Sequence, residues 1–130
     1  MQDAALKDDI NLQFQFDVLR RSKRLPKGSY IDDLIKDGDK IESRFLVIRK
    51  RENGLEYNRY AVNVSKKLEK SAVKRNRLRR QIYEIVRLLE KAENIKNEKK
   101  LDIIFFARKT LLGKSYQEIE EALTSLLKNL

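Results

Sequence analysis

The sequence predicts an α+β fold, a compact sandwich in which helices cover a small β-sheet. Two runs rich in β-forming residues, at 43–51 and 58–65, follow one another closely. A long segment with apolar residues at helical spacing separates them from a third such run at 101–109. With 130 residues, the chain is long enough for one domain. We therefore expect the order helix, strand, strand, helix, strand, helix (αββαβα), which is typical of a layered α+β domain.

The N-terminal part of the chain is expected to lie outside this domain. Residues 1–24 mix acidic residues with the stretch INLQFQFDVL and end on RRSKR. We interpret them as an N-terminal extension and residues 25–130 as a single domain. The alternation of Leu12, Phe14 and Phe16 leaves open that part of the extension adds a strand to the edge of the sheet.

The first expected element of the domain is a short helix. Ser29 is a residue type that caps helix N-termini, and Gly38 is typical of a helix end. Between them, Ile31, Leu34 and Ile35 have the spacing of one helical face. This face is expected to pack on the sheet.

The next two elements are expected to be strands. Asn53-Gly54 is a turn signal between them, so we predict an antiparallel hairpin whose loop is longer than two residues. In the second strand, Tyr60, Val62 and Val64 alternate with other residues and so share one face. The strand–helix–strand passage over 59–108 makes the second and third strands parallel if they are neighbours.

The long helix that follows has an apolar stripe and a basic side. The stripe consists of Leu78, Ile82, Ile85, Val86 and Leu89. Roughly opposite to it lie Asn76, Arg80, Tyr83 and Arg87. One helix can therefore be buried along one side and present cations along the other.

The chain is expected to end with a buried strand and an amphipathic helix. The apolar run from Ile103 to Phe106 is typical of a strand covered on both faces. Ser115 and Glu118 have the spacing of a capping box, which predicts the start of the last helix.

The composition narrows the classes of function. Thirty basic against twenty acidic residues give a formal charge of +10, which favours a polyanionic partner: nucleic acid first and an anionic membrane second. The chain has no cysteine and no histidine, so thiol chemistry, catalytic triads and ordinary zinc sites are disfavoured. It has no apolar run of about twenty residues and no signal-like N-terminus, so we expect a cytoplasmic protein.

The positive charge is concentrated in one segment, at the junction between the second strand and the long helix. Within this segment Glu69 is the only acid. The candidate RNA-binding residues are Lys66, Lys67, Lys70, Lys74, Arg75, Asn76, Arg77, Arg79 and Arg80. Arginine can hold a phosphate through two hydrogen bonds and lysine acts as a mobile point charge, so the mixture suits a nucleic-acid backbone.

The charged residues are also compatible with two alternative roles. A run of charges is most often a solvated helix face, although here the run is nearly free of acids and begins at a helix N-terminus, which itself attracts phosphate. The acidic residues Asp32, Asp33, Asp37 and Asp39 could hold Mg²⁺ in a protein-only nuclease, but a solvated surface accounts for them more simply.

The segment VSKKLEKSAVKRNRLRRQI, residues 64–82, resembles the protein subunit of bacterial ribonuclease P. That family has a strand ending in Val-Ser-Lys-Lys or similar, a short link and an Arg-Asn-Arg helix, here Arg75, Asn76 and Arg77. The later segments DIIFFARK and SYQEIEEAL are similar to the family's third strand and last helix, so the likeness covers about residues 24–130. The resemblance implies the αββαβα sandwich with a left-handed strand–helix–strand crossover, against the usual rule.

The resemblance also implies a function. In this family an RNA subunit uses Mg²⁺ to remove the 5′ leader of precursor tRNA, and the protein is an accessory without chemistry of its own. The implied partners are ribonuclease P RNA and precursor tRNA, with neither DNA nor a membrane, and the Mg²⁺ is bound mainly by RNA. The basic helix would contact the catalytic RNA. A general RNA-binding or ribosome-associated protein with the same helix is the alternative.

The family binds the single-stranded leader in a groove between the first helix and the sheet, and here this chain departs from the pattern. Two phenylalanines one helical turn apart are common in the family, and Ile31 and Ile35 occupy their positions. A common aromatic residue of the first strand is replaced by Arg49. Base stacking there would then require Tyr30 or Tyr60 to turn into the groove.

Overall fold

The computed structural model describes residues 23–26, 28–93, 95, 97–128 and 130 of the chain. Its elements, in chain order, are α2 (Ser29–Asp37), β1 (Asp39–Glu42), β2 (Leu46–Glu52), β3 (Arg59–Asn63), α3 (Ala72–Lys91), β4 (Leu101–Ala107), the 3-10 helix η2 (Lys109–Leu111) and α4 (Tyr116–Leu127). The possible edge strand of Leu12, Phe14 and Phe16 lies outside the described residues. None of the helices described is long and apolar enough to cross a membrane.

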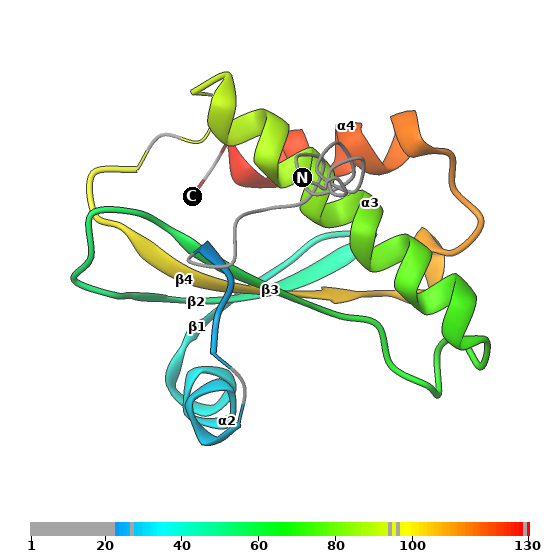
Figure 1. Cartoon of the computed structure of the whole chain (residues 1–130), viewed down its shortest axis with the longest axis horizontal. Coiled ribbons are helices and arrows are strands. Elements are labelled where there is room, and N and C mark those ends of the chain that lie inside the picture. Colours follow the sequence, from blue (N-terminus) through cyan, green and yellow to red (C-terminus); the bar gives the residue numbers. More distant parts are fainter. Residues whose placement is uncertain (1–22, 27, 94, 96, 129) are drawn as a thin grey trace, which may run out of the picture.

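The four strands form one sheet in the order β1-β2-β4-β3. Helices α3 and α4 cover one face of this sheet, and α2 lies across the other face (Figure 1). The expected α+β sandwich is therefore confirmed, with β1 as a short strand that the sequence analysis did not predict. β1 pairs antiparallel with β2 and lies at the edge of the sheet.

The predicted hairpin between the first two long strands is wrong. β4 lies between β2 and β3, antiparallel to β2 and parallel to β3. The Asn53-Gly54 segment is a loop that carries the chain past β4, and Asn53 shapes it: its Nδ2 donates to the Tyr57 carbonyl at 3.0 Å and its Oδ1 accepts from the Leu55 N–H at 2.8 Å. The most apolar strand occupies the interior of the sheet, where both of its faces are covered.

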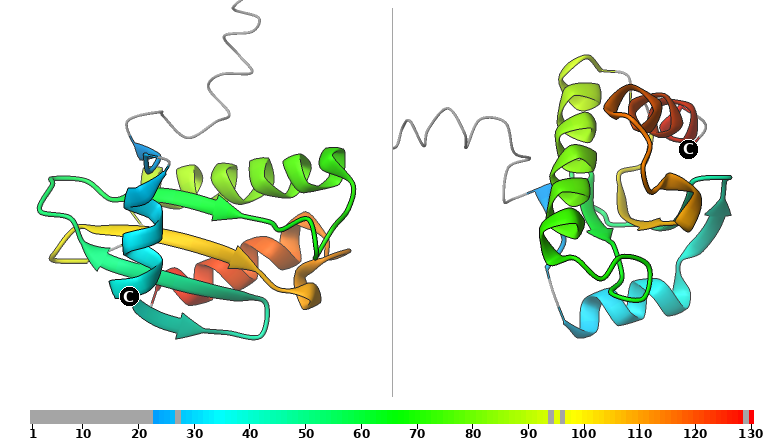
Figure 2. Two further views of the ribbon diagram at one scale, coloured as in Figure 1. Left: turned by 90° about the horizontal axis from the view of Figure 1, so that it is seen from below. Right: turned by 90° about the vertical axis from the view of Figure 1, so that its right-hand side faces the viewer.

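The connection from β3 through α3 to β4 is a left-handed crossover. Figure 2 shows the sheet from the α2 side, with β3 and β4 pointing the same way and α3 behind them. When both strands are turned to point upward, β4 lies to the right of β3, and this arrangement is left-handed. Most parallel connections have the opposite hand, so the resemblance correctly implied an uncommon topology.

The main core lies between the sheet and the two long helices. All five residues of the predicted α3 stripe are buried there. Tyr60 stacks on Phe105 with 6.2 Å between the ring centroids. A second, smaller cluster lies between α2 and the sheet and consists of Leu25, Leu34 and Ile104. The two layers of side chains explain why β4 is apolar on both faces.

The predicted helix ends are confirmed in part. Ser115 and Glu118 form the expected capping box at the start of α4. Helix α2, in contrast, begins after Gly28, and Ser29 is its first residue rather than its cap. Gly38 does lie at the end of α2, as predicted. A side chain would not fit there, because a Cβ would lie 2.5 Å from the Leu34 carbonyl oxygen.

Candidate RNA interface

The basic run begins in the connection between β3 and α3. The N–H groups of Leu68 and Glu69 both donate to the Ser65 carbonyl at 3.1 Å, so the connection is a hydrogen-bonded turn. Leu68 packs against the main core and anchors this turn. Lys66 and Lys67 are exposed on it. The local fold therefore presents two lysines at a defined place beside the sheet.

The N-terminus of α3 is capped, but nothing acidic lies in its first turn. The Ser71 hydroxyl accepts from the Lys74 N–H at 3.3 Å, and the Ser71 N–H donates to the Glu69 carboxylate at 3.1 Å. Arg75 Nη1 donates to the carbonyls of Glu69 and Lys70, both at 2.9 Å. Arg75 thus holds the connection in place, which is a structural task that the sequence analysis did not foresee.

The next turn carries the Arg-Asn-Arg segment on the outer side of α3. Asn76, Arg77 and Arg80 are exposed, while Arg79 is half-buried and donates to the Asn76 side-chain oxygen. Tyr83 lies on the same side of the helix, but its hydroxyl accepts the Val62 N–H at 3.2 Å. The predicted basic side of α3 is therefore exposed over its first turns and packs against β3 further along.

The predicted RNA-binding residues are thus gathered at one end of the molecule. The exposed cations among them are Lys66, Lys67, Lys70, Lys74, Arg77 and Arg80. They surround the N-terminus of a 20-residue helix, where the backbone N–H groups and the helix dipole also favour anions. Repulsion among these cations and with the helix dipole destabilises the free protein locally. A bound phosphate would reduce this repulsion.

Further segments add cations to the same end. The 108–114 segment, which contains η2, lies beside the start of α3 in both views (Figures 1 and 2). Arg108 and Lys109 are exposed in it. The Arg44 guanidinium and the Lys114 amine lie 5.5 and 5.7 Å from the centroid of the Phe45 ring. The sequence analysis missed this group because its members are far apart in the chain.

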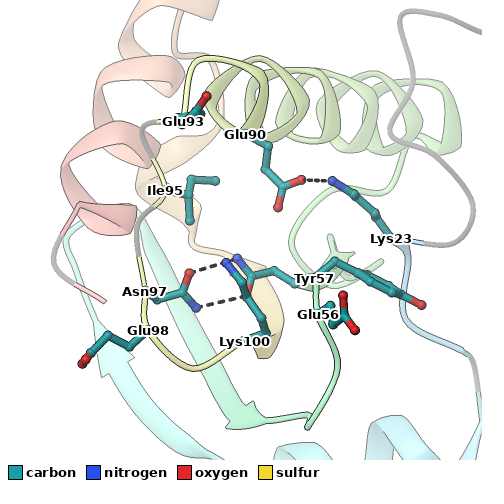
Figure 3. A pocket seen from close by; sticks show the side chains of 10 residues that line it. Lys23, Glu56, Tyr57, Glu90, Glu93, Ile95, Asn97, Glu98 and Lys100 are labelled. Carbon is teal, nitrogen blue, oxygen red and sulfur yellow. Dashed lines mark hydrogen bonds and ion pairs between the residues drawn. The ribbon is translucent and has the colours of Figure 1, made fainter.

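The opposite end of the molecule carries an acidic pocket of about 650 Å³ (Figure 3). Four glutamates line it: Glu56, Glu90, Glu93 and Glu98. Lys23 forms an ion pair with Glu90 at 2.7 Å across the pocket. Because carboxylates repel phosphate, the pocket does not extend the candidate RNA interface, and the molecule has a basic end and an acidic end.

The sheet face that α2 crosses, here called the α2 face, is built from alternate residues of the three long strands. In register order these are Val47, Arg49, Arg51, Arg59, Ala61, Asn63, Asp102, Ile104 and Phe106. Ile31 and Ile35 of α2, two residues of the predicted leader groove, are half-buried against the cluster under the helix. Arg49 also lies on this face, and its Nη1 donates to the Gly38 carbonyl at 3.1 Å.

A buried carboxylate fixes the start of α2 on this face. Arg59 donates to both Asp102 oxygens at 2.9 Å, and Asn53 and the Tyr30 hydroxyl donate to them as well. Burial raises the pKa of Asp102, but the hydrogen bonds from Arg59, Tyr30 and Asn53 outweigh it and hold this pKa below its ordinary value. The Arg51 and Arg59 guanidiniums lie 5.3 and 5.5 Å from the Tyr30 ring centroid.

This network decides what the two predicted tyrosines can do. The Tyr30 hydroxyl is engaged by Asp102 and two guanidiniums lie against its ring, so Tyr30 is a support for α2 rather than a free stacking surface. Tyr60 is fully buried on the opposite face of the sheet, where its hydroxyl donates to Glu90 at 2.6 Å. The suggestion that Tyr60 turns into the groove is therefore wrong.

The acidic residues of α2 and β1 do not gather into a metal site. Asp32, Asp33, Asp37 and Asp39 are all exposed. Within the described part of the chain, no group of three or more carboxylate, histidine or cysteine side chains could hold a metal ion. The described side chains therefore do not form a site for protein-bound Mg²⁺, and the proposed Asp32–Asp39 metal site of a protein-only nuclease gains no support from them.

Sequence comparison identifies relatives over most of the chain. The family model described as Ribonuclease P matches residues 19–130. The ribonuclease P protein component of Alkaliphilus oremlandii is 37% identical over 112 residues, which cover 86% of this chain and 94% of that protein. The ribonuclease P protein component of Clostridium kluyveri is 38% identical over 105 residues, covering 81% and 91%.

Solved structures show the same architecture. The RNase P protein from Thermotoga maritima superposes with a TM-score of 0.71 at 27% identity, and the match covers 82% of this chain and 96% of that one. The Staphylococcus aureus RNase P protein gives a TM-score of 0.70 at 27% identity, with coverage of 82% and 94%.

Proposed function

Because the chain belongs to the ribonuclease P protein family, we propose that it is the protein subunit of a bacterial ribonuclease P. Membership implies a role in tRNA 5′ processing within a ribonucleoprotein. In the proposed complex, the chain binds the catalytic RNA and the 5′ leader of precursor tRNA and assists the Mg²⁺-dependent removal of the leader in the cytoplasm.

The observation that carries this proposal is the set of exposed cations around the N-terminus of α3. Six lysine and arginine side chains are exposed between residues 66 and 80, where Glu69 is the only acid. Cations placed along RNA release condensed counterions, which supplies sequence-independent affinity. We assign this surface to the catalytic RNA.

The α2 face is assigned to the leader in the same proposal. It adjoins the basic end, because β3 leads directly into the connection that carries Lys66 and Lys67. A strand of RNA lying on this face would therefore remain close to positive charge. In this proposal the RNA subunit binds the Mg²⁺ and carries out the chemistry.

Reconstitution with the cognate RNA subunit tests the proposal. Single-turnover cleavage of a 5′-labelled precursor tRNA is measured over a range of Mg²⁺ concentrations, with the RNA alone, the protein alone and both together. We expect the protein alone to cut nothing and the mixture to cleave at Mg²⁺ concentrations where the RNA alone is slow, because the added cations offset phosphate repulsion.

Two results would contradict the proposal in different ways. Tight binding of the RNA subunit without any gain in cleavage would favour the general RNA-binding alternative. Metal-dependent cleavage by protein that is free of RNA would instead restore the nuclease hypothesis, and replacing Asp37 and Asp39 would then have to abolish it.

A further inference from the structure

The α2 face holds one aromatic residue that projects from the sheet itself. Phe106 lies on β4 two residues beyond Ile104, so both side chains are on the same face. Phe106 is half-buried and packs against the cluster of Leu25, Leu34 and Ile104. Part of its ring is thus supported by the protein while the rest is open.

The register neighbours of Phe106 differ in how far they are exposed. In the sheet register its neighbours are Val47 on β2 and Asn63 on β3, which is exposed. Figure 2 shows that α2 crosses the strands nearer the start of β4, and the strands extend beyond it toward the basic end. Phe106 lies two residues nearer the end of β4 than Ile104, which is buried in the cluster between α2 and the sheet.

The remaining aromatic residues near this face are committed elsewhere. The Tyr30 hydroxyl is held by Asp102, and guanidiniums lie within 5.5 Å of its ring centroid. Tyr60 is fully buried in the core on the far side of the sheet. Among the three long strands and α2, Phe106 is the aromatic side chain that stays partly exposed on this face without such a charged partner.

Cations follow Phe106 in the chain after β4, and cations also follow its register partner in the chain after β3. Two residues further along the chain, Arg108 is exposed and forms an ion pair with Glu42 at 3.5 Å, and Lys109 after it is exposed. Asn63, its register partner, is followed by the turn that presents Lys66 and Lys67. An aromatic ring between two groups of cations suits the binding of single-stranded RNA, because a base can stack on the ring while the phosphates contact the cations.

We propose that Phe106 is the platform on which a base of the single-stranded 5′ leader stacks. The inference rests on the proposed function and extends it to one residue. It also accounts for the presence of Ile31 and Ile35 at the positions where aromatic residues are common in the family. In this chain the aromatic surface would come from the sheet instead of from α2. The isoleucines then make apolar contact with the side of the bound base.

The holoenzyme reconstituted with the cognate RNA tests this assignment. Its affinity is measured for a precursor tRNA with a five-nucleotide leader and for the mature tRNA. The variants are Phe106→Leu, which keeps apolar volume, and Phe106→Tyr, which keeps the ring. Tyr57→Leu, an exposed aromatic residue in the loop at the acidic end, is the matched control.

We expect Phe106→Leu to weaken binding of the leader-bearing substrate about tenfold. Its affinity for mature tRNA should stay unchanged, and Phe106→Tyr and Tyr57→Leu should behave like the parent. In the same samples, the fluorescence of a 2-aminopurine base placed in the leader should be quenched on binding to the parent holoenzyme and not on binding to the Phe106→Leu holoenzyme.

Each contrary result has a separate meaning. A parent holoenzyme that does not distinguish the two RNAs would overturn the leader assignment in the proposed function, and this inference with it. Leader-dependent affinity that survives in Phe106→Leu would overturn the inference alone. An equal loss for both RNAs in Phe106→Leu would show a disturbed fold and would also overturn it.

Discussion

Asp102 shows how one residue positions an element. Its carboxylate is completely buried and receives hydrogen bonds from Arg59 of β3, from Asn53 in the loop after β2 and from Tyr30 of α2. A buried charge without such partners would be strongly unfavourable, so the four groups stabilise one another as a set. The network joins the start of α2 to β3 and β4, and thereby fixes the position of α2 on the α2 face.

Removing this charge should destabilise the fold in a pH-dependent way. We expect Asp102→Asn to lower the free energy of unfolding at pH 7 by about 2 to 4 kcal/mol, because Arg59 loses its partner. The folded pKa of Asp102 lies below its unfolded value. Its contribution is therefore complete above the unfolded pKa of about 3.9 and is lost as pH falls through the folded pKa.

Urea unfolding between pH 7 and pH 3 measures this difference. The gap between the parent and Asp102→Asn should narrow below about pH 4. Glu52→Gln is the control, since Glu52 is an exposed carboxylate 3.7 Å from Lys99. A gap that stays constant with pH would show that the Asp102 charge does not contribute as described.

The Asp102 network could not have been predicted from the sequence. A single carboxylate at the start of an otherwise apolar strand is a signal that such a residue has a partner. However, Tyr30, Asn53 and Arg59 reach it only because β4 inserts between β2 and β3. The sequence analysis placed those two strands side by side, so it offered no reason to bring these residues together.

At the level of elements, α3 combines packing with charge. Its five stripe residues are buried, which was predicted correctly because helical periodicity depends only on local spacing. Its first turn contains no acid and two cations, Lys74 and Arg75, which opposes the helix dipole. The helix is therefore stabilised by its core contacts, and the charges at its N-terminus do not add to its stability.

Reversing one charge at this terminus should separate stability from binding. We expect Lys74→Glu to raise the free energy of unfolding of the free protein by about 0.3 to 1 kcal/mol, since an anion at a helix N-terminus is favourable. The same change should weaken RNA binding, because Lys74 is exposed among the candidate contacts. Lys74→Gln is the control with an intermediate charge.

Thermal or urea unfolding and a binding titration on the same preparations provide the measurement. Opposite trends in stability and affinity across Lys, Gln and Glu are expected. If Lys74→Glu binds RNA as tightly as the parent, then Lys74 lies outside the interface.

The pairing of the strands was the main error at this scale. The Asn53-Gly54 signal correctly indicated a turn, but a turn does not determine which strand lies next to which. β2 and β3 both pair with β4, the strand with the most buried residues. Long-range pairing depends on burial in the whole sheet, which local sequence signals do not report.

At the level of the whole molecule, charge is separated along the long axis. The exposed cations of residues 66–80 and the 108–114 segment lie at one end, and the glutamate-lined pocket lies at the other. The basic run was found from the sequence because its members are consecutive. The contribution of residues 108–114 required the fold, since topology brings that segment beside α3.

This separation predicts how RNA approaches the protein. The basic end is expected to attract phosphate and the acidic end to repel it, so one orientation is favoured before close contact forms. The strands extend beyond α2 toward the basic end (Figure 2), so an RNA bound on the α2 face would also be close to the cations.

The most direct test of the account is the salt dependence of affinity for the RNA subunit. The basic-end variant carries Lys67→Gln, Lys74→Gln and Arg77→Gln, and leaves Arg75 to hold the connection before α3. The control carries Lys91→Gln, Lys99→Gln and Lys128→Gln, which removes the same charge from exposed residues away from the basic end.

We expect the slope of log K against log salt to become shallower by about one unit for each phosphate that the basic-end variant no longer neutralises. The control should keep the parent slope, although its net charge equals that of the basic-end variant. Equal changes in both variants would contradict the account, because affinity would then follow net charge rather than the surface around the N-terminus of α3.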